Sequence, residues 1–228
     1  MKLLVACVLV FGASAVSAQE FAPGTSPGPD ALHRERIEWC DIWITDADKD
    51  DRPRVLFIGD SITRGYFEFV EKALEGKTYC ARLTSSRSVC DPVFFNELGL
   101  ILSQYEFDVI HFNNGLHGWL YSEAEYKEGV EDLISALRKY APQAKLVWAA
   151  TTPVKHSSSM SNHEARVKDR NAIAAEIMAR EKIAINDMFK FVADHMEYIG
   201  DDGIHFTREG KEAQGEKAAN AVLNALKD

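Results

Sequence analysis

Cysteine is scarce in this chain, with four in 228 residues, and no group of histidines and cysteines has the spacing of a zinc site. The scarcity excludes a small scaffold in which disulfides replace a hydrophobic core. With 46% hydrophobic residues, a chain of this length can bury one full core, so we expect one globular domain. No metal ion or other cofactor is expected.

Basic residues are also in deficit, with 26 Lys and Arg against 35 Asp and Glu and a net charge of -9 at pH 7. Such an acidic balance disfavours nucleic acid and anionic membranes as partners. Asp46, Asp48 and Asp50 alternate like the start of a calcium-binding loop, but Asp51 replaces the required glycine and Phe57 the bidentate glutamate. We interpret this run as a solvated acidic turn.

The apolar run near the N-terminus is too short to span a bilayer, so no membrane-spanning segment is expected. It follows Lys2, extends over residues 3–13 and gives way to small residues that end at Ala18. This is the pattern of a signal peptide comprising residues 1–18 and cleaved after Ala18. The sequence therefore predicts a secreted or periplasmic protein.

Three cysteines lie beyond this segment, and export permits disulfides between them. Cys80 falls in a predicted strand and Cys90 in the loop that follows, so a bridge between these two is the first choice. Cys40 would then stay unpaired or pair with another chain. Spacing alone does not establish the geometry of a bridge, and three unpaired thiols are the alternative.

Residues 19–53 are expected to form a lead-in to the folded domain. Residues 20–29 are rich in Pro, Gly and Ser and are expected to be extended, with a short helix at 31–43. From residue 54 onward, strand and helix patterns alternate. The strands are expected at 55–58, 78–83, 108–113, 145–150 and 184–186. The helices are expected at 66–76, 93–104, 123–140, 164–181 and 207–226.

This alternation predicts an α/β fold for residues 54–228, a three-layer α/β/α sandwich on a five-stranded parallel sheet. Ser122 and Glu125 have the spacing of a capping box at the start of the third helix. In such folds, ligands bind beyond the carboxyl ends of the strands. His111 lies within a predicted strand, and we expect it to be a core residue.

Three polar motifs fall at this edge of the predicted sheet. Gly59-Asp60-Ser61 follows a buried strand and precedes a helix, a turn that exposes the serine hydroxyl near the positive end of the helix dipole. Asn113-Asn114-Gly115 ends the third strand, and Asp202 and His205 share one loop. A histidine that removes the serine proton and an acid that orients the imidazole are what serine ester cleavage requires.

Together these motifs carry a family resemblance. Gly59-Asp60-Ser61-Ile62, the loop 88–92, the run Asn113 to His117 and the run Asp202 to His205 resemble the four sequence blocks of the SGNH (GDSL-type) hydrolases, over about residues 54–226. The resemblance implies the SGNH, flavodoxin-like architecture and serine ester hydrolysis without a cofactor. It implies that Ser61 is the nucleophile, His205 the acid–base residue and Asp202 its partner.

The resemblance also implies an oxyanion hole, made by the N–H groups of Ser61 and Cys90 and the side-chain amide of Asn113. Two features depart from the common pattern. Cys90 stands where the second block has glycine, and the third block is similar to that of the polysaccharide O-acetyl transfer and esterase branches. Asn113 is preferred over Asn114 because strand alternation places it at the end of the strand. Further substrate contacts are expected from Asn114, His117, Trp119 and Arg64. The alternative for His117 and Trp119 is packing of their loop onto the core, and the alternative for Arg64 is a surface salt bridge.

The sequence therefore predicts a secreted serine esterase acting on a small acyl ester, with acetylated carbohydrate as the expected substrate. One alternative is a lipid or thioester hydrolase of the same superfamily. Another is a noncatalytic carbohydrate-binding protein on an esterase scaffold.

Overall fold

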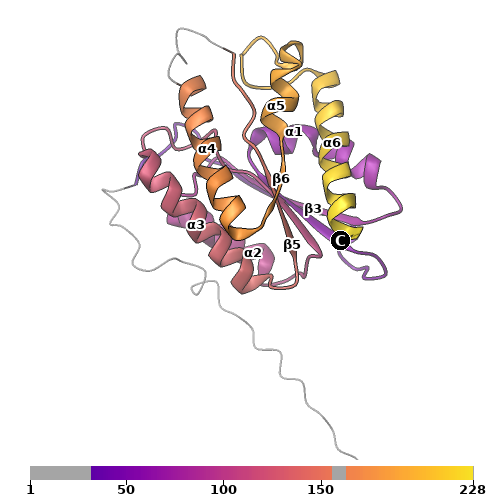
Figure 1. The fold of residues 1–228 in the computed structure, drawn as a ribbon. Helices are drawn as coiled ribbons and strands as arrows, with labels where there is room; N and C mark the ends of the chain where they lie inside the picture. The colour runs from indigo at the N-terminus through magenta and orange to yellow at the C-terminus, as the bar shows by residue number, and fades with distance from the viewer. Residues whose placement is uncertain (1–31, 156–162, 228) are drawn as a thin grey trace, which may run out of the picture.

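The computed structural model describes residues 32–155 and 163–227. The predicted signal peptide lies outside these residues. The chain forms one six-stranded sheet in the strand order β1-β3-β2-β4-β5-β6, with helices on both faces (Figure 1). The strands are β1 (Cys40–Ile44), β2 (Arg54–Gly59), β3 (Tyr79–Ser85), β4 (Val109–Phe112), β5 (Lys145–Ala149) and β6 (Ala184–Asn186). The predicted α/β/α sandwich is confirmed.

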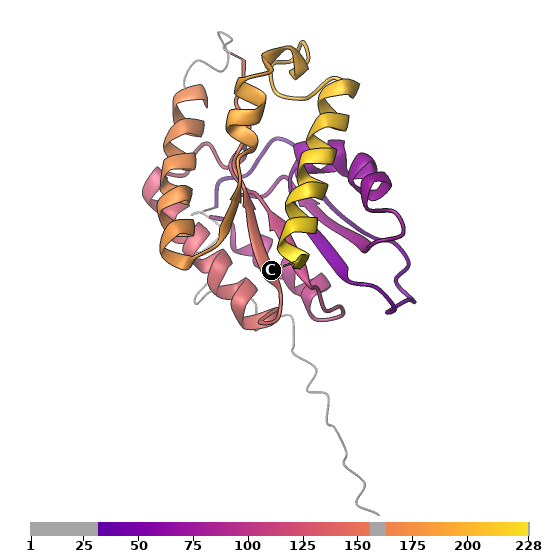
Figure 2. The ribbon, with the colours of Figure 1, turned by 45° about the vertical axis from the view of Figure 1, so that its right-hand side comes forward.

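Two groups of helices cover the sheet. One core cluster joins the sheet to α2 (Pro92–Leu102), α3 (Glu123–Tyr140) and α4 (His163–Glu181). The other joins it to α1 (Ser61–Leu74), α5 (Met188–Ala193) and α6 (Arg208–Lys227). Figure 2 shows the yellow α6 beside the purple α1, on the side of the sheet away from α3. None of the described helices has the length and apolarity of a membrane-spanning helix.

The central strands are apolar because both of their faces are covered. All residues of β2 and β4 are buried, as expected for a parallel strand between two helical layers. The capping box of α3 forms as predicted, with Ser122 and Glu125 each accepting a backbone N–H of the other. Because β2, β3, β4 and β5 run parallel, their carboxyl ends meet at one edge of the sheet, from which the loops of the site project.

The predicted short helix at 31–43 is wrong, and the sheet has six strands instead of five. Residues 40–44 form β1, which pairs antiparallel with β3 at the edge of the sheet. Ile42 and Ile44 pack on the core while Trp43 is exposed, a period of two that fits a strand. The preceding segment is held by backbone contacts, with Trp39 N–H donating to Ser86 Oγ at 2.9 Å.

The predicted bridge between Cys80 and Cys90 is also wrong, since both are free thiols, as is Cys40. Cys80 belongs to the core cluster beneath α1 and α6, whereas Cys90 packs against the cluster on the opposite face of the sheet. The two side chains therefore do not meet. Burial raises the pKa of both thiols to about 11, which keeps them protonated at neutral pH.

Candidate active site

The nucleophile turn joins β2 to α1. Asp60 is the N-cap of α1, and its Oδ1 accepts the N–H of Ile62 at 2.8 Å. A Cβ on Gly59 would lie 2.1 Å from Thr63 Oγ1, so the backbone passes too close to the helix for any side chain at this position. Ser61 is the first residue of α1 and is half-buried at the carboxyl edge of the sheet.

A loop before α6 brings two more side chains to this serine. His205 Nε2 lies 2.9 Å from Ser61 Oγ, and His205 Nδ1 lies 2.6 Å from Asp202 Oδ2. The other oxygen of Asp202 accepts the N–H groups of Ile204 at 2.9 Å and His205 at 2.8 Å. The structure thus places the three predicted catalytic side chains in one continuous chain of hydrogen bonds.

The loop that carries Asp202 and His205 is fixed at several points. Ile199 and Phe206 form a β-bridge across its base, and Gly200 N–H donates to the carbonyl of His205 at 2.7 Å. Gly203 has a φ of 78°, a conformation that favours glycine, and its carbonyl accepts the N–H of Lys155 at 2.8 Å. These contacts hold the loop, and with it the His205 imidazole, in place.

Ser61 and His205 line a cavity of about 230 Å³, together with Ile62, Arg64, Gly65, Phe206 and Lys211. A larger groove of about 980 Å³ runs between β6 and α6, but it contains none of the three hydrogen-bonded side chains. The smaller cavity is therefore the candidate active site, because Ser61 and His205 line it. No cluster of potential metal ligands occurs in residues 32–155 or 163–227.

The two asparagines after β4 have different partners. The Asn113 amide nitrogen donates to the Ala149 carbonyl at 2.7 Å and to Thr151 Oγ1 at 3.0 Å. The Asn114 amide is buried, donates to the Arg87 carbonyl at 2.8 Å and accepts the Val89 N–H at 3.1 Å. Asn114 therefore ties the end of β4 to the loop that carries Cys90.

With this geometry established, solved structures provide a comparison. A GDSL-like lipase from Parabacteroides merdae matches with a TM-score of 0.61 at 17% identity, covering 78% of this chain and 97% of that one. An acetyl esterase mutant with acetate ion matches with a TM-score of 0.63 at 15% identity, covering 77% and 99%. A carbohydrate esterase family 3 protein from Talaromyces cellulolyticus matches with a TM-score of 0.61 at 14% identity, covering 77% and 99%.

The chain has the SGNH hydrolase fold. No protein-family model matches the sequence, and a search of curated proteins finds no match. The similarity to these proteins is thus one of structure, at low sequence identity. The roles of individual residues have to be argued from the geometry of this chain.

On this SGNH scaffold, the loop after Asn114 packs against α4. His117 Nδ1 lies 3.4 Å from Glu35 Oε1, and Glu35 also accepts the Gly118 N–H at 3.1 Å. Burial lowers the pKa of His117, but the hydrogen bond to Glu35 and the nearby Asp60 charge outweigh it and raise the pKa. The Trp119 ring stacks on His163 at 4.2 Å, so its face is covered by protein.

Sequence reasoning missed Arg170, which holds this loop in place. Its side chain is fully buried and donates to the carbonyls of Gly115 at 3.0 Å, His117 at 2.8 Å and Gly118 at 2.9 Å. A signal for it exists in the sequence, because Arg170 falls on the same helical stripe as the buried Val167 and Ala174. A charged residue on an apolar stripe requires buried polar partners.

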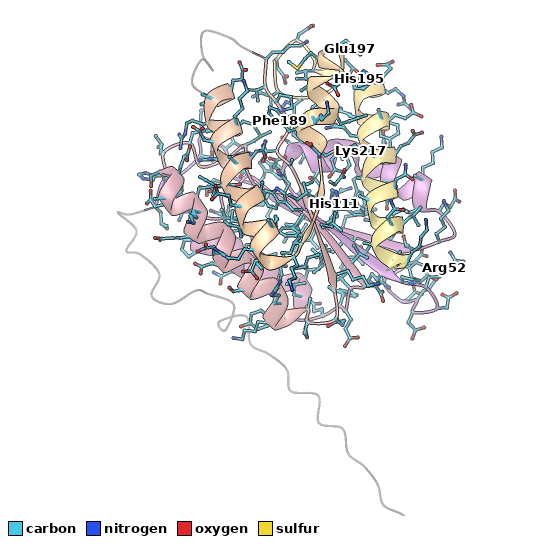
Figure 3. All side chains as sticks on the ribbon, in the orientation of Figure 1. Arg52, His111, Phe189, His195, Glu197 and Lys217 are labelled. Carbon is cyan, nitrogen blue, oxygen red and sulfur yellow. The ribbon has the colours of Figure 1, made fainter. Side chains whose placement is uncertain are left out.

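His111 is a core residue, as predicted. It is buried on β4 in the interior of the molecule (Figure 3), with Nε2 3.0 Å from the Asn186 amide nitrogen. Burial lowers its pKa to about 3, so the imidazole is neutral across the physiological range. It is separate from the hydrogen-bonded chain of Ser61.

The ionisation of Asp202 gives a pH prediction. Partial burial raises its pKa, but hydrogen bonds from Ile204 N–H and from the side chain and N–H of His205 lower it from 3.8 to about 2. Because the folded pKa is depressed, the stability this carboxylate contributes is present above pH 4 and lost as the pH falls toward 2.

We therefore expect Asp202 to add no ionisation of its own to the acid side of the kcat/KM profile above pH 4. Asp202→Asn should retain residual activity, because the imidazole loses its orienting acceptor but the base remains. A second acid-side ionisation above pH 4 that disappears in Asp202→Asn would contradict this assignment.

Proposed function

We propose that the protein is a secreted serine esterase that hydrolyses short acyl esters, with O-acetyl groups on carbohydrate as its substrates. The observation that carries the proposal is the 2.9 Å contact from His205 Nε2 to Ser61 Oγ, with Asp202 2.6 Å from the other imidazole nitrogen. A histidine held in this way can remove the proton of the serine hydroxyl as its oxygen attacks.

The mechanism follows from the order of these contacts. Ser61 Oγ attacks the ester carbonyl carbon while His205 Nε2 takes the hydroxyl proton. The tetrahedral intermediate collapses, and the departing alkoxide receives that proton as the alcohol leaves. Water then attacks the acyl-enzyme, with His205 again accepting and returning a proton, and the carboxylic acid is released. Asp202 orients the imidazole and stabilises its charged form.

The oxyanion formed in each step needs N–H donors. Ser61 lies in the first turn of α1, where helix N–H groups lack partners within the helix, and this supports its N–H as one donor. The Cys90 N–H donates to Ser88 Oγ at 3.2 Å in the resting protein and would exchange this bond for the oxyanion. The third donor is proposed to come from the loop after β4.

For that donor, the hydrogen bonds favour Asn114 over the predicted Asn113. Both amide N–H groups of Asn113 have partners, whereas within the described residues Asn114 donates only to Arg87. We expect Asn114→Ala to lower kcat about 10²-fold with little change in KM, and Asn113→Ala to have a smaller effect. Steady-state kinetics and a thermal melt of each variant test this ranking. The reverse ranking would assign the donor to Asn113.

Substrate size and class are supported by two observations. The cavity at Ser61 has a volume of about 230 Å³, which suits a short acyl group better than a long chain. Proteins of the same fold include an acetyl esterase and a carbohydrate esterase. An acetyl group on a sugar hydroxyl matches both observations.

The experiment is a comparison of acyl chains followed by a comparison of glycans. The purified protein is given p-nitrophenyl acetate, butyrate and palmitate, and then a panel of acetylated polysaccharides with acetate release as the readout. We expect the highest kcat/KM with acetate and release of acetate from at least one glycan. A preference for palmitate would favour the lipid hydrolase alternative, and binding without hydrolysis would favour the noncatalytic one.

Export is part of the proposal and has its own test. Residues 1–18 have the charge, apolar run and small residues of a signal peptide. When the full chain is expressed in a bacterium, we expect N-terminal sequencing of the mature protein to begin at Gln19, and fractionation to place it outside the cytoplasm. An intact Met1 end on a cytoplasmic protein would contradict export.

A further inference from the structure

Two cations line the cavity of Ser61. Arg64 and Lys211 both border it, and neither forms an ion pair within residues 32–155 and 163–227. The chain as a whole carries nine more acidic than basic residues. Several other arginines of the described residues do have acidic partners, as Arg82 has in Asp41 at 2.9 Å and Arg166 has in Glu123 at 2.5 Å.

Arg64 is positioned by an aromatic ring. Its guanidinium lies 4.5 Å from the centroid of the Trp39 ring, a cation–π contact. Trp39 is in turn fixed by backbone contacts to Ser86, since its N–H donates to Ser86 Oγ at 2.9 Å and its carbonyl accepts the Ser86 N–H at 3.1 Å. The ring orients the cation through its face and leaves the in-plane N–H donors available to a ligand.

The side chain of Lys211 packs against Gly65, which has no side chain of its own. Its Cε would lie 3.4 Å from a Cβ built on Gly65, and its Cδ and Cγ are 3.8 Å and 3.9 Å away, so the alkyl stem lies against α1. Gly65 follows Arg64 in the chain and borders the same cavity. The stem of Lys211 is therefore packed, while its ammonium group has no ion-pair partner in the part of the chain that the structure describes.

Apolar and aromatic contacts thus hold two positive charges at the cavity of the nucleophile, and no described acidic residue pairs with them. We propose that this pair binds a carboxylate on the substrate, so that the preferred ester is an O-acetyl group on an acidic sugar such as a uronic acid unit. The inference rests on the proposed esterase function and specifies its substrate class. An acetyl group has no charge, so the anion belongs to the sugar that carries it. A guanidinium and an ammonium group are suited to a carboxylate in a partly desolvated cavity.

The test uses two sugars that differ in one charge, a partially O-acetylated methyl galacturonoside and its uronamide, with acetate release as the readout. We expect wild type to favour the uronate in kcat/KM by about tenfold or more, and added salt to reduce this ratio. Arg64→Gln and Lys211→Gln should each lower the ratio about five- to tenfold, mainly through KM. Lys217→Gln is the matched control. Lys217 lies on α6 (Figure 3), the same helix as Lys211, but its ammonium group lies 5.3 Å from the centroid of the Phe191 ring. It should leave the ratio unchanged.

The controls separate this inference from the proposed function. Equal rates with uronate and uronamide, or cleavage of p-nitrophenyl acetate without deacetylation of either sugar, would overturn the carboxylate assignment alone. A ratio that falls as much in Lys217→Gln as in Lys211→Gln would also overturn it, since net charge would then be the cause. Absence of all three activities in wild type would overturn the esterase function itself.

Discussion

Ser61→Ala is expected to lower kcat for ester hydrolysis by about 10⁴-fold or more while the protein remains folded. The hydroxyl contacts His205 Nε2 at 2.9 Å and lies half-buried at the start of α1. Its removal therefore leaves no large cavity and no buried group unpaired. Turnover of p-nitrophenyl acetate and a thermal melt on the same preparation provide the two measurements.

A double variant tests whether Ser61 and His205 act as one unit. His205→Ala should lose about as much activity as Ser61→Ala, and the double variant should lose little more, because each single change disables the same reacting unit. Losses that multiply in the double variant would mean that the two residues act separately. Wild-type turnover in Ser61→Ala would place the nucleophile elsewhere.

Arg170→Met is expected to lower the free energy of unfolding by about 3 kcal/mol or more, the largest effect on stability that we expect. The substitution keeps an unbranched side chain in the core but removes the donors to the carbonyls of Gly115, His117 and Gly118. Buried carbonyls without partners are costly. Activity should also fall, because these residues follow Asn113 and Asn114 directly.

Arg180→Met is the matched control for this experiment. Arg180 lies on the same helix, but it is exposed and pairs with Glu131 and Glu181 at the surface. Its loss should change the free energy of unfolding by about 0.5 kcal/mol or less. Urea denaturation of the two variants measures the difference, and equal stabilities would contradict the role given to Arg170.

Much of this architecture could be predicted because its strands and helices differ in period and length. The 184–186 strand and the 123–140 helix have the bounds that the sequence indicates, and Ser122 caps that helix as expected. The edge strand β1 was predicted as a helix because its stabilisation comes from pairing with β3, a contact between residues about 40 positions apart. Short α5 has too few residues to show a clear period.

The site was predictable to the extent that its chemistry is local. Asp202 and His205 lie in one loop and contact each other directly. Ser61 lies in a turn where Asp60 caps the helix and Gly59 passes close to Thr63, both contacts between near neighbours in the sequence. The contributions of Arg170 and Glu35 depend on which distant loops they reach, and sequence spacing does not encode that. The cysteine bridge failed for the same reason, since Cys80 and Cys90 are ten positions apart but lie on opposite faces of the sheet.

The most direct test of the central claim is to trap the covalent intermediate. Wild-type protein is mixed with p-nitrophenyl acetate, quenched in acid within the first turnovers and digested for peptide mass spectrometry. We expect one acetyl group on the peptide that contains Ser61, assigned by fragmentation to the serine, and none in Ser61→Ala. Acetylation of a different residue during turnover, or full turnover by Ser61→Ala, would contradict the claim that Ser61 is the nucleophile.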